Sequence, residues 1–352
     1  MKNLVIIGKV FPEPNSTAAG YRMIQLMDLF LTQNYQITFL STATISENSF
    51  DLSSKNISFQ NIVLNDSSFD ELIKNLNPEI VIFDRFTTEE QFGWRVSEQV
   101  PNAVKILDTE DLHFLRTARE KAFKQNRNLE HLDLINDVFK REIASILRCD
   151  LSLIISEFEM NLLIEKFRID ENILFYLPLF GEVKKPETSF SERKNFISIG
   201  NFLHEPNWQT VLQLKKLWKN IKNQLQEAEI HIYGAYASEK VFQLHNEKEG
   251  FIIKGRAESV ETVFNTAKVL LAPIPFGAGI KGKLLESMQF GLPNVTSTIG
   301  AEAMHGNFEW NGFITDNENE FIEKVVLLYQ DENLWQKSQE KGFNIIENRF
   351  KK

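Results

Sequence analysis

Short runs of Val, Ile, Leu and Phe alternate along the chain with longer stretches in which apolar residues recur at helical spacing. In the first half, the short runs are residues 4–7, 36–40, 80–83, 104–107 and 151–155. Strands buried inside a parallel sheet appear in the sequence as continuous apolar runs, and parallel neighbours are joined by helical crossovers. The pattern therefore predicts an α/β fold built on a parallel sheet.

A polar segment, GEVKKPETSFSERKN at residues 181–195, interrupts this alternation. Beyond it the pattern resumes, with apolar runs at residues 196–199, 229–233, 251–253, 269–272 and 294–296. A strand, a glycine turn and a helix start open both halves, in VIIGKVFPEPN (5–15) and SIGNFLHEPN (198–207). We therefore expect two Rossmann-like domains facing across a cleft, residues 1–180 and 196–335, joined by the linker 181–195. Residues 336–352 are expected to form a C-terminal helix that packs back on the first domain.

The composition is that of a packed globular protein, with 43% hydrophobic and 25% charged residues over 352 positions. The net charge of -9 argues against nucleic acid as a partner, because phosphate binding needs a surplus of Lys and Arg. Cys149 is the only cysteine, which excludes an internal disulfide and fits the cytoplasm. Apolar runs are too short to span a bilayer, so any membrane contact is expected to be peripheral, at the inner face.

The segment from residue 270 to 297 is the richest in candidate chemistry, because it predicts a strand, a glycine loop, a helix and a further strand. Gly277, Gly279 and Gly282 allow a ligand close to the backbone, and the helix start that follows attracts anions. A diphosphate suits this position, with Lys281 and Lys283 as counter-charges and the helical Glu286 as an acceptor for ribose hydroxyls. The alternative is a tight turn with solvated lysines and a Glu286 that complements the helix dipole.

The run PIPFGAGIKGKLLESMQFGLP, followed by TSTIGAEAM, resembles the donor-binding signature of the family 4 nucleotide-sugar glycosyltransferases. These enzymes have two Rossmann-like domains in the GT-B arrangement. The segments SIGNFLHEPNWQTV and FIIKGRAESVETVFNTAKVLLAPI are similar to other parts of their C-terminal domain. In the first half, ILDTEDLHFLR and LIISEFEM resemble segments found in a subset of the family.

The resemblance implies roles for residues of the second half. Glu286 would hold the donor ribose, Lys281 and Lys283 its diphosphate, and the loop at Gly255 and Arg256 would lie beside the base. Many relatives have a second glutamate near the donor sugar, where this chain has Ala278, so the backbone of Gly277, Ala278, Gly279 and Ile280 would contact the sugar instead. In the turn that opens the second domain, Gly200, Asn201, Glu205 and Asn207 either line the donor pocket or cap the next helix, and capping is the preferred interpretation of Asn207.

In the first half, the resemblance places Gly20 close to the diphosphate and His113 in the active site, after a buried strand. Arg22 is a candidate partner for phosphate or acceptor, with a solvated helix charge as the alternative. Asp108 and Asp111 flank the histidine, where they would orient it or bind acceptor hydroxyls. The acidic run 108–111 also suggests a metal cluster, but the lysines already supply positive charge, so no metal is expected.

The expected function is transfer of a sugar from a nucleotide-diphosphate donor to a glycan, lipid-linked or other acceptor, with retention and without a metal or other cofactor. His113, Lys281 and Glu286 are the candidate catalytic residues, and the expected context is cell-envelope or secreted polysaccharide biosynthesis. A sugar-nucleotide epimerase and a non-catalytic nucleotide-sugar-binding partner of a transferase stay open as alternatives. The basic and aromatic segment from Phe114 to Arg148 either contacts an anionic membrane or is a solvated helix face.

Overall fold

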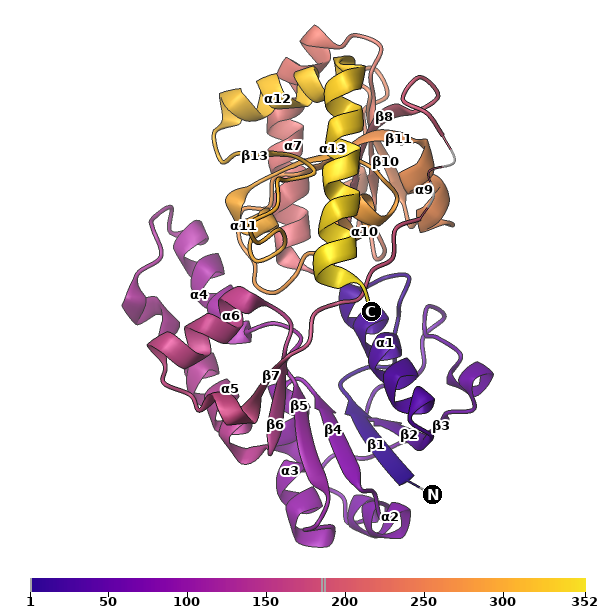
Figure 1. The fold of residues 1–352 in the computed structure, drawn as a ribbon, viewed down its shortest axis with the longest axis vertical. Coiled ribbons are helices and arrows are strands. Elements are labelled where there is room, and N and C mark those ends of the chain that lie inside the picture. Colours follow the sequence, from indigo (N-terminus) through magenta and orange to yellow (C-terminus); the bar gives the residue numbers. More distant parts are fainter. Residues whose placement is uncertain (1, 185, 187) are drawn as a thin grey trace. The chain divides into compact units, whose positions relative to one another are not determined.

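The computed structural model describes residues 2–184, 186 and 188–352, which form two compact units. The first unit ends at Leu179 and the second begins at Phe180. Figure 1 shows that each unit has its own sheet with helices packed around it. Every strand pair in both sheets is parallel, as the alternation of apolar runs and amphipathic helices predicts.

The first unit contains a seven-stranded sheet in the order β3-β2-β1-β4-β5-β6-β7. The order reverses between β1 and β4, which pair with Leu4 opposite Ile80. Its strands are β1 (Lys2–Gly8), β2 (Tyr35–Ser41), β3 (Ser58–Asn61), β4 (Ile80–Asp84), β5 (Val104–Asp108), β6 (Leu151–Ile154) and β7 (Leu174–Tyr176). Its α-helices are α1 (Ala18–Thr32), α2 (Ser68–Leu76), α3 (Phe86–Gln99), α4 (His113–Lys124), α5 (Asp137–Arg148) and α6 (Glu157–Asn161).

The second unit contains a six-stranded sheet in the order β10-β9-β8-β11-β12-β13. Here the order reverses between β8 and β11, where Phe196 lies opposite Val269. Its strands are β8 (Lys194–Ile199), β9 (Ile230–Tyr233), β10 (Phe251–Gly255), β11 (Ala267–Ala272), β12 (Asn294–Thr296) and β13 (Gly312–Ile314). Its helices are α7 (Glu205–Gln224), α8 (Glu239–Phe242), α9 (Val260–Thr266), α10 (Gly282–Gln289), α11 (Thr298–Ala301), α12 (Glu318–Gln330), α13 (Glu332–Ile345) and the π-helical turn η5 (Ile346–Phe350).

All ten strands expected from apolar runs are present, and the structure adds three more, β3, β7 and β13. Each of the three is an edge strand, and all four residues of β3 are exposed. An edge strand pairs on one side only and does not have to be apolar on both faces, so its sequence lacks the continuous run that marks a central strand.

The segment 181–195, which was expected to be a linker, is bonded to the second unit at several points. The Gly181 amide donates to the Phe350 carbonyl (2.7 Å) and the Lys184 amide to the Gln289 carbonyl (2.8 Å). Arg193 is 1% exposed, and its guanidinium donates to the carbonyls of Phe264 (2.9 Å) and Phe290 (3.2 Å). The start and the end of the second unit are therefore held together by backbone and side-chain hydrogen bonds.

The candidate donor site and the polar edge of the first sheet

The glycine loop of the second unit follows β11 and is anchored by the end of the neighbouring strand β12. The Thr296 hydroxyl donates to the Ala272 carbonyl (2.7 Å) and the Ser297 hydroxyl donates to the Ile274 carbonyl (2.6 Å). Gly279 has a φ of +64°, a backbone conformation that favours glycine. The loop thus enters α10 along a fixed path, and among the described residues none caps the N-terminus of α10 with its side chain. The amide groups of that first turn point to the carboxyl edge of the sheet.

The loop is located where ligands bind in open α/β sheets. Strand order reverses between β8 and β11, and the crevice at such a reversal lies outside the carboxyl ends of the two strands. The turn at Gly200 follows β8 and the glycine loop follows β11, so the two expected donor-binding segments flank the same crevice. This agrees with the notion of a bound diphosphate, but it also fits any small anion.

Lys281 folds back over the glycine loop. Its ammonium group donates to the carbonyls of Ala278 (3.1 Å) and Gly279 (2.6 Å). Ala278 and Ile280, two of the residues expected to contact the donor sugar, are 8% and 7% exposed. A diphosphate that meets Lys281 would have to compete with these two carbonyls.

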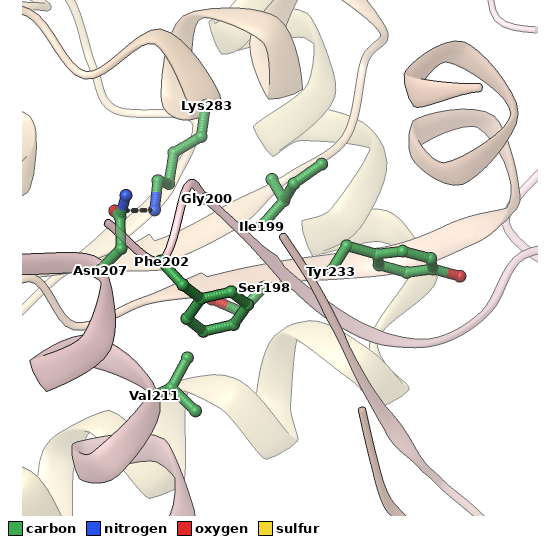
Figure 2. Close-up of a pocket in the computed structure, with 8 residues that line it drawn as sticks. All are labelled: Ser198, Ile199, Gly200, Phe202, Asn207, Val211, Tyr233 and Lys283. Carbon is green, nitrogen blue, oxygen red and sulfur yellow. Dashed lines mark hydrogen bonds between the residues drawn. The ribbon is translucent and has the colours of Figure 1, made fainter. Parts of the chain in front are cut away.

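Lys283 reaches from α10 to α7, where its ammonium group donates to the Oδ1 atom of Asn207 (2.7 Å). Figure 2 shows this contact in a narrow pocket that is also lined by Gly200. The remaining lining residues are Ser198, Ile199, Phe202, Val211 and Tyr233. Burial lowers the pKa of Lys283 to about 8, against an opposing effect of the Glu286 charge.

Glu286 lies on α10, three residues after Lys283, and is half-buried. Burial raises its pKa to about 7, although the positive charges of Lys283 and Lys184 act in the opposite direction. A carboxyl and an ammonium group with strongly shifted pKa values therefore share one helix beside the crevice, and such pairs concentrate at functional sites.

The capping interpretation of Asn207 is wrong. Helix α7 begins at Glu205, so Asn207 lies inside the helix rather than at its N-cap. Its Nδ2 atom donates to the Asn201 carbonyl (2.9 Å), and the Asn201 side chain in turn accepts from the Leu203 amide (2.8 Å). The Glu205 carboxylate accepts from the Gln209 side chain (2.8 Å) and does not line the pocket.

Gly255 and Arg256 lie at the end of β10. Gly255 has a φ of +69°, and its carbonyl accepts from the Gly234 amide (2.8 Å), which ties the end of β10 to that of β9. Arg256 is exposed. Their expected place beside the base stays a prediction.

In the first unit, His113 begins α4 and is held by a buried glutamate that the sequence analysis did not single out. The Nδ1 atom of His113 lies 3.0 Å from the Asp111 carbonyl and 3.3 Å from the Oε1 atom of Glu142. Glu142, on α5, is fully buried and accepts the amides of His113 (3.1 Å) and Phe114 (3.0 Å). A carbonyl can only accept, so the Nδ1 atom carries a proton and donates it to the Asp111 carbonyl, which leaves Nε2 as the ring nitrogen for other partners.

Arg22 and Asp108 are buried and paired with each other. Arg22 is 1% exposed and Asp108 is 0% exposed, which makes the solvated-charge interpretation of Arg22 wrong. The Nε atom of Arg22 lies 2.8 Å and 3.1 Å from the two carboxylate oxygens of Asp108. Their expected contacts to phosphate or acceptor stay a prediction. Asp111 is bonded to Arg116 through its Oδ2 atom (2.5 Å).

Gly20 has a packing reason to be glycine. It lies in the first turn of α1, where a Cβ atom would come within 2.5 Å of the Glu13 backbone. Its amide donates to the Thr17 hydroxyl (2.9 Å), which caps the helix. The backbone of Glu13 therefore covers the face of Gly20 that would otherwise be open.

Sequence reasoning also missed Asp84 and Arg85, at the carboxyl end of β4, and considered Glu110, which follows β5, only as part of the acidic run 108–111. Arg85 (φ +71°) and Glu110 (φ +64°) both adopt a left-handed backbone conformation, which is strained for residues with a Cβ atom. Asp84 accepts from the Lys9 amide (3.1 Å) across the reversal between β1 and β4. Burial, together with the Asp108 charge, raises the pKa of Glu110 to about 8. Only the three-dimensional meeting of two strand ends marks these residues.

The segment from Phe114 to Arg148 pairs most of its basic side chains with carboxylates. Among these pairs, Arg127 contacts Asp133 at 2.6 Å and Arg141 contacts Glu90 at 2.6 Å. Arg148 contacts Glu89 at 2.5 Å, and Leu132 in the intervening loop is 77% exposed. This pairing favours the solvated-face interpretation, because paired cations attract an anionic surface less.

Among the described residues, 2–184, 186 and 188–352, no helix combines the length and the apolar character that crossing a bilayer requires. No three His, Cys, Asp or Glu side chains among them are grouped closely enough to hold a metal ion.

Residues 193–331 match the sequence profile of the glycosyl transferases group 1 family. Residues 193–331 form a group 1 glycosyltransferase domain. This domain includes β8 to α12, and with them the Gly200 turn, the glycine loop and Glu286. No curated protein sequence matches the chain.

Solved structures extend the comparison to both units of the chain. A crystal structure of TarM superimposes with a TM-score of 0.76 at 10% identity, over 99% of this chain and 96% of that chain. The pneumococcal O-GlcNAc transferase GtfA, solved with UDP and GlcNAc, gives a TM-score of 0.73 at 13% identity, over 99% and 96% of the two chains. For an S. aureus TarM variant solved with UDP, fondaparinux and alpha-GlcNAc-glycerol, the TM-score is 0.64 at 14% identity, and the match covers 80% of this chain and 55% of that chain. The predicted fold of two Rossmann-like units of the GT-B type is therefore confirmed.

Proposed function

We propose that this protein transfers a sugar from a nucleotide-diphosphate donor to a glycan or lipid-linked acceptor. The observation that carries the proposal is the arrangement at the β8/β11 reversal, where a glycine loop, an uncapped helix N-terminus, Lys281, Lys283 and Glu286 meet. Positive charge and backbone amides suit a diphosphate, and a carboxylate on the next turn suits the ribose hydroxyls.

In this proposal the charge that develops on the departing diphosphate is stabilised by fixed groups of the protein. The ammonium groups of Lys281 and Lys283 already lie at the loop and at the helix start, and they would exchange carbonyl and amide partners for phosphate oxygens when the donor binds. These groups would lower the barrier if they bind the departing diphosphate more strongly in the transition state than in the intact donor. We propose retention of anomeric configuration and no metal or other cofactor.

We propose that His113 is the residue of the first unit that contacts the substrate. The carbonyl of Asp111 and the carboxylate of Glu142 hold its Nδ1 atom, so the ring has a fixed orientation and Nε2 is the nitrogen for substrate. We propose that this nitrogen contacts a hydroxyl of the substrate.

The proposed setting is cell-envelope or secreted glycan synthesis, in the cytoplasm or at the inner face of the membrane. Two structural neighbours are consistent with this proposal. One is WaaG, a glycosyltransferase involved in lipopolysaccharide biosynthesis, and the other is Anabaena Alr3699/HepE, which was solved with UDP.

The test is incubation of the purified protein with a panel of nucleotide-diphosphate sugars, analysed by NMR and chromatography. Transfer, or slow release of the nucleotide diphosphate in the absence of acceptor, is the expected outcome. Formation of an epimeric sugar nucleotide would favour an epimerase, and binding without turnover would favour a non-catalytic partner. Absence of both binding and turnover across the panel would refute the proposal.

A further inference from the structure

The Asn207 side chain is held in one orientation by two different partners. Its Nδ2 atom donates to the Asn201 carbonyl (2.9 Å), and its Oδ1 atom accepts from the Lys283 ammonium group (2.7 Å). A flipped amide would turn its oxygen to the carbonyl and its NH₂ to the ammonium group, which would be repulsive on both sides. Asn207 therefore fixes the end of a flexible lysine side chain to the turn after β8 (Figure 2).

Gly200 provides the space for this amide. A Cβ atom on residue 200 would come within 2.6 Å of the Asn207 Cγ atom, closer than carbon atoms approach without a shift of one of them. Gly234 supports the same turn from β9, since a Cβ atom there would lie 2.2 Å from the Gly200 carbonyl oxygen. Two glycines, one after β8 and one after β9, thus leave room for the contact between Asn207 and Lys283.

The amide is also the right chemical group for a lysine that is to bind an anion. The charged groups that act on Lys283 are Glu286 and Lys281, and Lys184 acts on Glu286 in turn. A carboxylate at position 207 would add a full negative charge at hydrogen-bond distance and would compete with a phosphate. A neutral oxygen accepts one N–H bond and leaves the positive charge in place.

We propose that Asn207 is a positioning residue. It holds the Lys283 ammonium group at the β8/β11 crevice through one hydrogen bond and leaves the other N–H groups of that ammonium group for an incoming diphosphate. This inference rests on the proposed function and adds to it a residue outside the glycine loop. The amide keeps the ammonium group partly desolvated and correctly directed, so the diphosphate meets an ordered cation rather than a mobile one.

The experiment measures binding of inorganic pyrophosphate to the full-length chain by calorimetry between pH 6 and 9.5. The variants are Asn207→Leu, which removes both hydrogen bonds at similar size, Asn207→Asp, which adds a charge, and Gly200→Ala, which displaces the amide. Gln209→Ala, on the same helix, is the matched control, because its side chain bonds only to Glu205 among the contacts described above. Circular dichroism checks that each variant is folded.

We expect Asn207→Leu and Gly200→Ala to weaken pyrophosphate binding about tenfold at pH 7, the size of a lost hydrogen bond to a charged group. The Asn207→Asp variant should bind pyrophosphate more weakly still at pH 7. Its affinity should begin to fall at a pH about one unit higher than for the unmodified protein, because the new carboxylate raises the pKa of Lys283. Comparing all proteins at the same pH removes the titration of pyrophosphate itself. Gln209→Ala should bind as the unmodified protein does.

The outcomes separate this inference from the proposed function. If the unmodified protein binds neither pyrophosphate nor any nucleotide diphosphate, the proposed donor site is wrong and the role of Asn207 with it. If the unmodified protein binds pyrophosphate and the folded Asn207 variants bind it equally well with the same pH dependence, only the positioning role is overturned. Should Asn207→Leu fail to fold, Gly200→Ala and Asn207→Asp decide the question by the same criteria.

Discussion

Arg22 and Asp108 form an ion pair in the interior of the first unit, with Nε–O distances of 2.8 Å and 3.1 Å and a further Nη2–Oδ1 distance of 2.8 Å. The pair joins α1 to the end of β5, and Arg22 also donates to the Leu177 carbonyl (2.7 Å), just after β7. One buried guanidinium thus connects a helix and two strand ends.

Replacing Arg22 by Met should lower the free energy of unfolding by about 3–5 kcal/mol, because it leaves the Asp108 carboxylate buried without its partner. Chemical denaturation measures this. Lys124→Ala, which breaks an exposed pair with Glu120, is the control and should cost about 0–1 kcal/mol. The double variant Arg22→Met with Asp108→Leu should recover part of the loss, and a strictly additive result would argue against direct coupling of the pair.

Donor binding should depend on pH with a maximum between about 7 and about 8. Glu286 must be ionised to accept two ribose hydroxyls, and its pKa of about 7 makes affinity rise as the pH increases through that value. Lys283 must be protonated to meet the diphosphate, and its pKa of about 8 makes affinity fall as the pH increases further. Calorimetry with a nucleotide-diphosphate sugar suits the measurement, since its phosphodiesters do not titrate in this range. A flat profile from pH 6 to 9 would show that neither group is used.

Glu286→Gln should weaken the binding of a nucleoside diphosphate without weakening the binding of pyrophosphate. The ribose loses a charged acceptor, so a nucleoside diphosphate should bind about 10- to 100-fold more weakly, while inorganic pyrophosphate should bind unchanged. Competition binding measures the ratio of the two ligands. Glu323→Gln, an exposed change on α12, is the control for loss of one negative charge. Equal losses for both ligands would place Glu286 at the phosphates instead of the ribose.

Gly312→Ala should destabilise the second unit by about 1–3 kcal/mol or more, because the residue has a φ of +123° and a Cβ atom would lie 2.0 Å from the Asn294 carbonyl oxygen. Gly277→Ala is the contrasting glycine change: its Cβ atom would lie 3.4 Å from Cε of Lys281, which is ordinary contact with a flexible side chain. Thermal unfolding compares the two. Equal stability of both variants would contradict the strain expected at position 312.

The central strands and the donor-site loop could be predicted from the sequence because their signals are local. A buried strand needs a continuous apolar run, and the loop between β11 and α10 needs glycines and a helix start, as in residues 277 to 286. The edge strands β3, β7 and β13 lacked such a signal, since half of their surroundings is solvent or loop.

The sequence could not predict which side chains pair with one another. Arg22 and Asp108 are 86 positions apart and Lys283 and Asn207 are 76 apart, so no periodicity relates them. Asn207 follows a turn and resembles a capping residue, yet the helix starts two residues earlier and turns its amide to Lys283.

The sequence by itself determined two α/β units, their central strands and the glycine loop at one strand end, because backbone conformation and burial are set by neighbouring residues. The tertiary structure alone decided which charges are available to a ligand. Strand order brings β8 beside β11, which pairs Lys283 with Asn207. The packing of α1 on β5 pairs Arg22 with Asp108, and the packing of α4 on α5 pairs His113 with Glu142. Charge interactions act through space over a few ångströms, and that distance is set by the fold rather than by position along the chain.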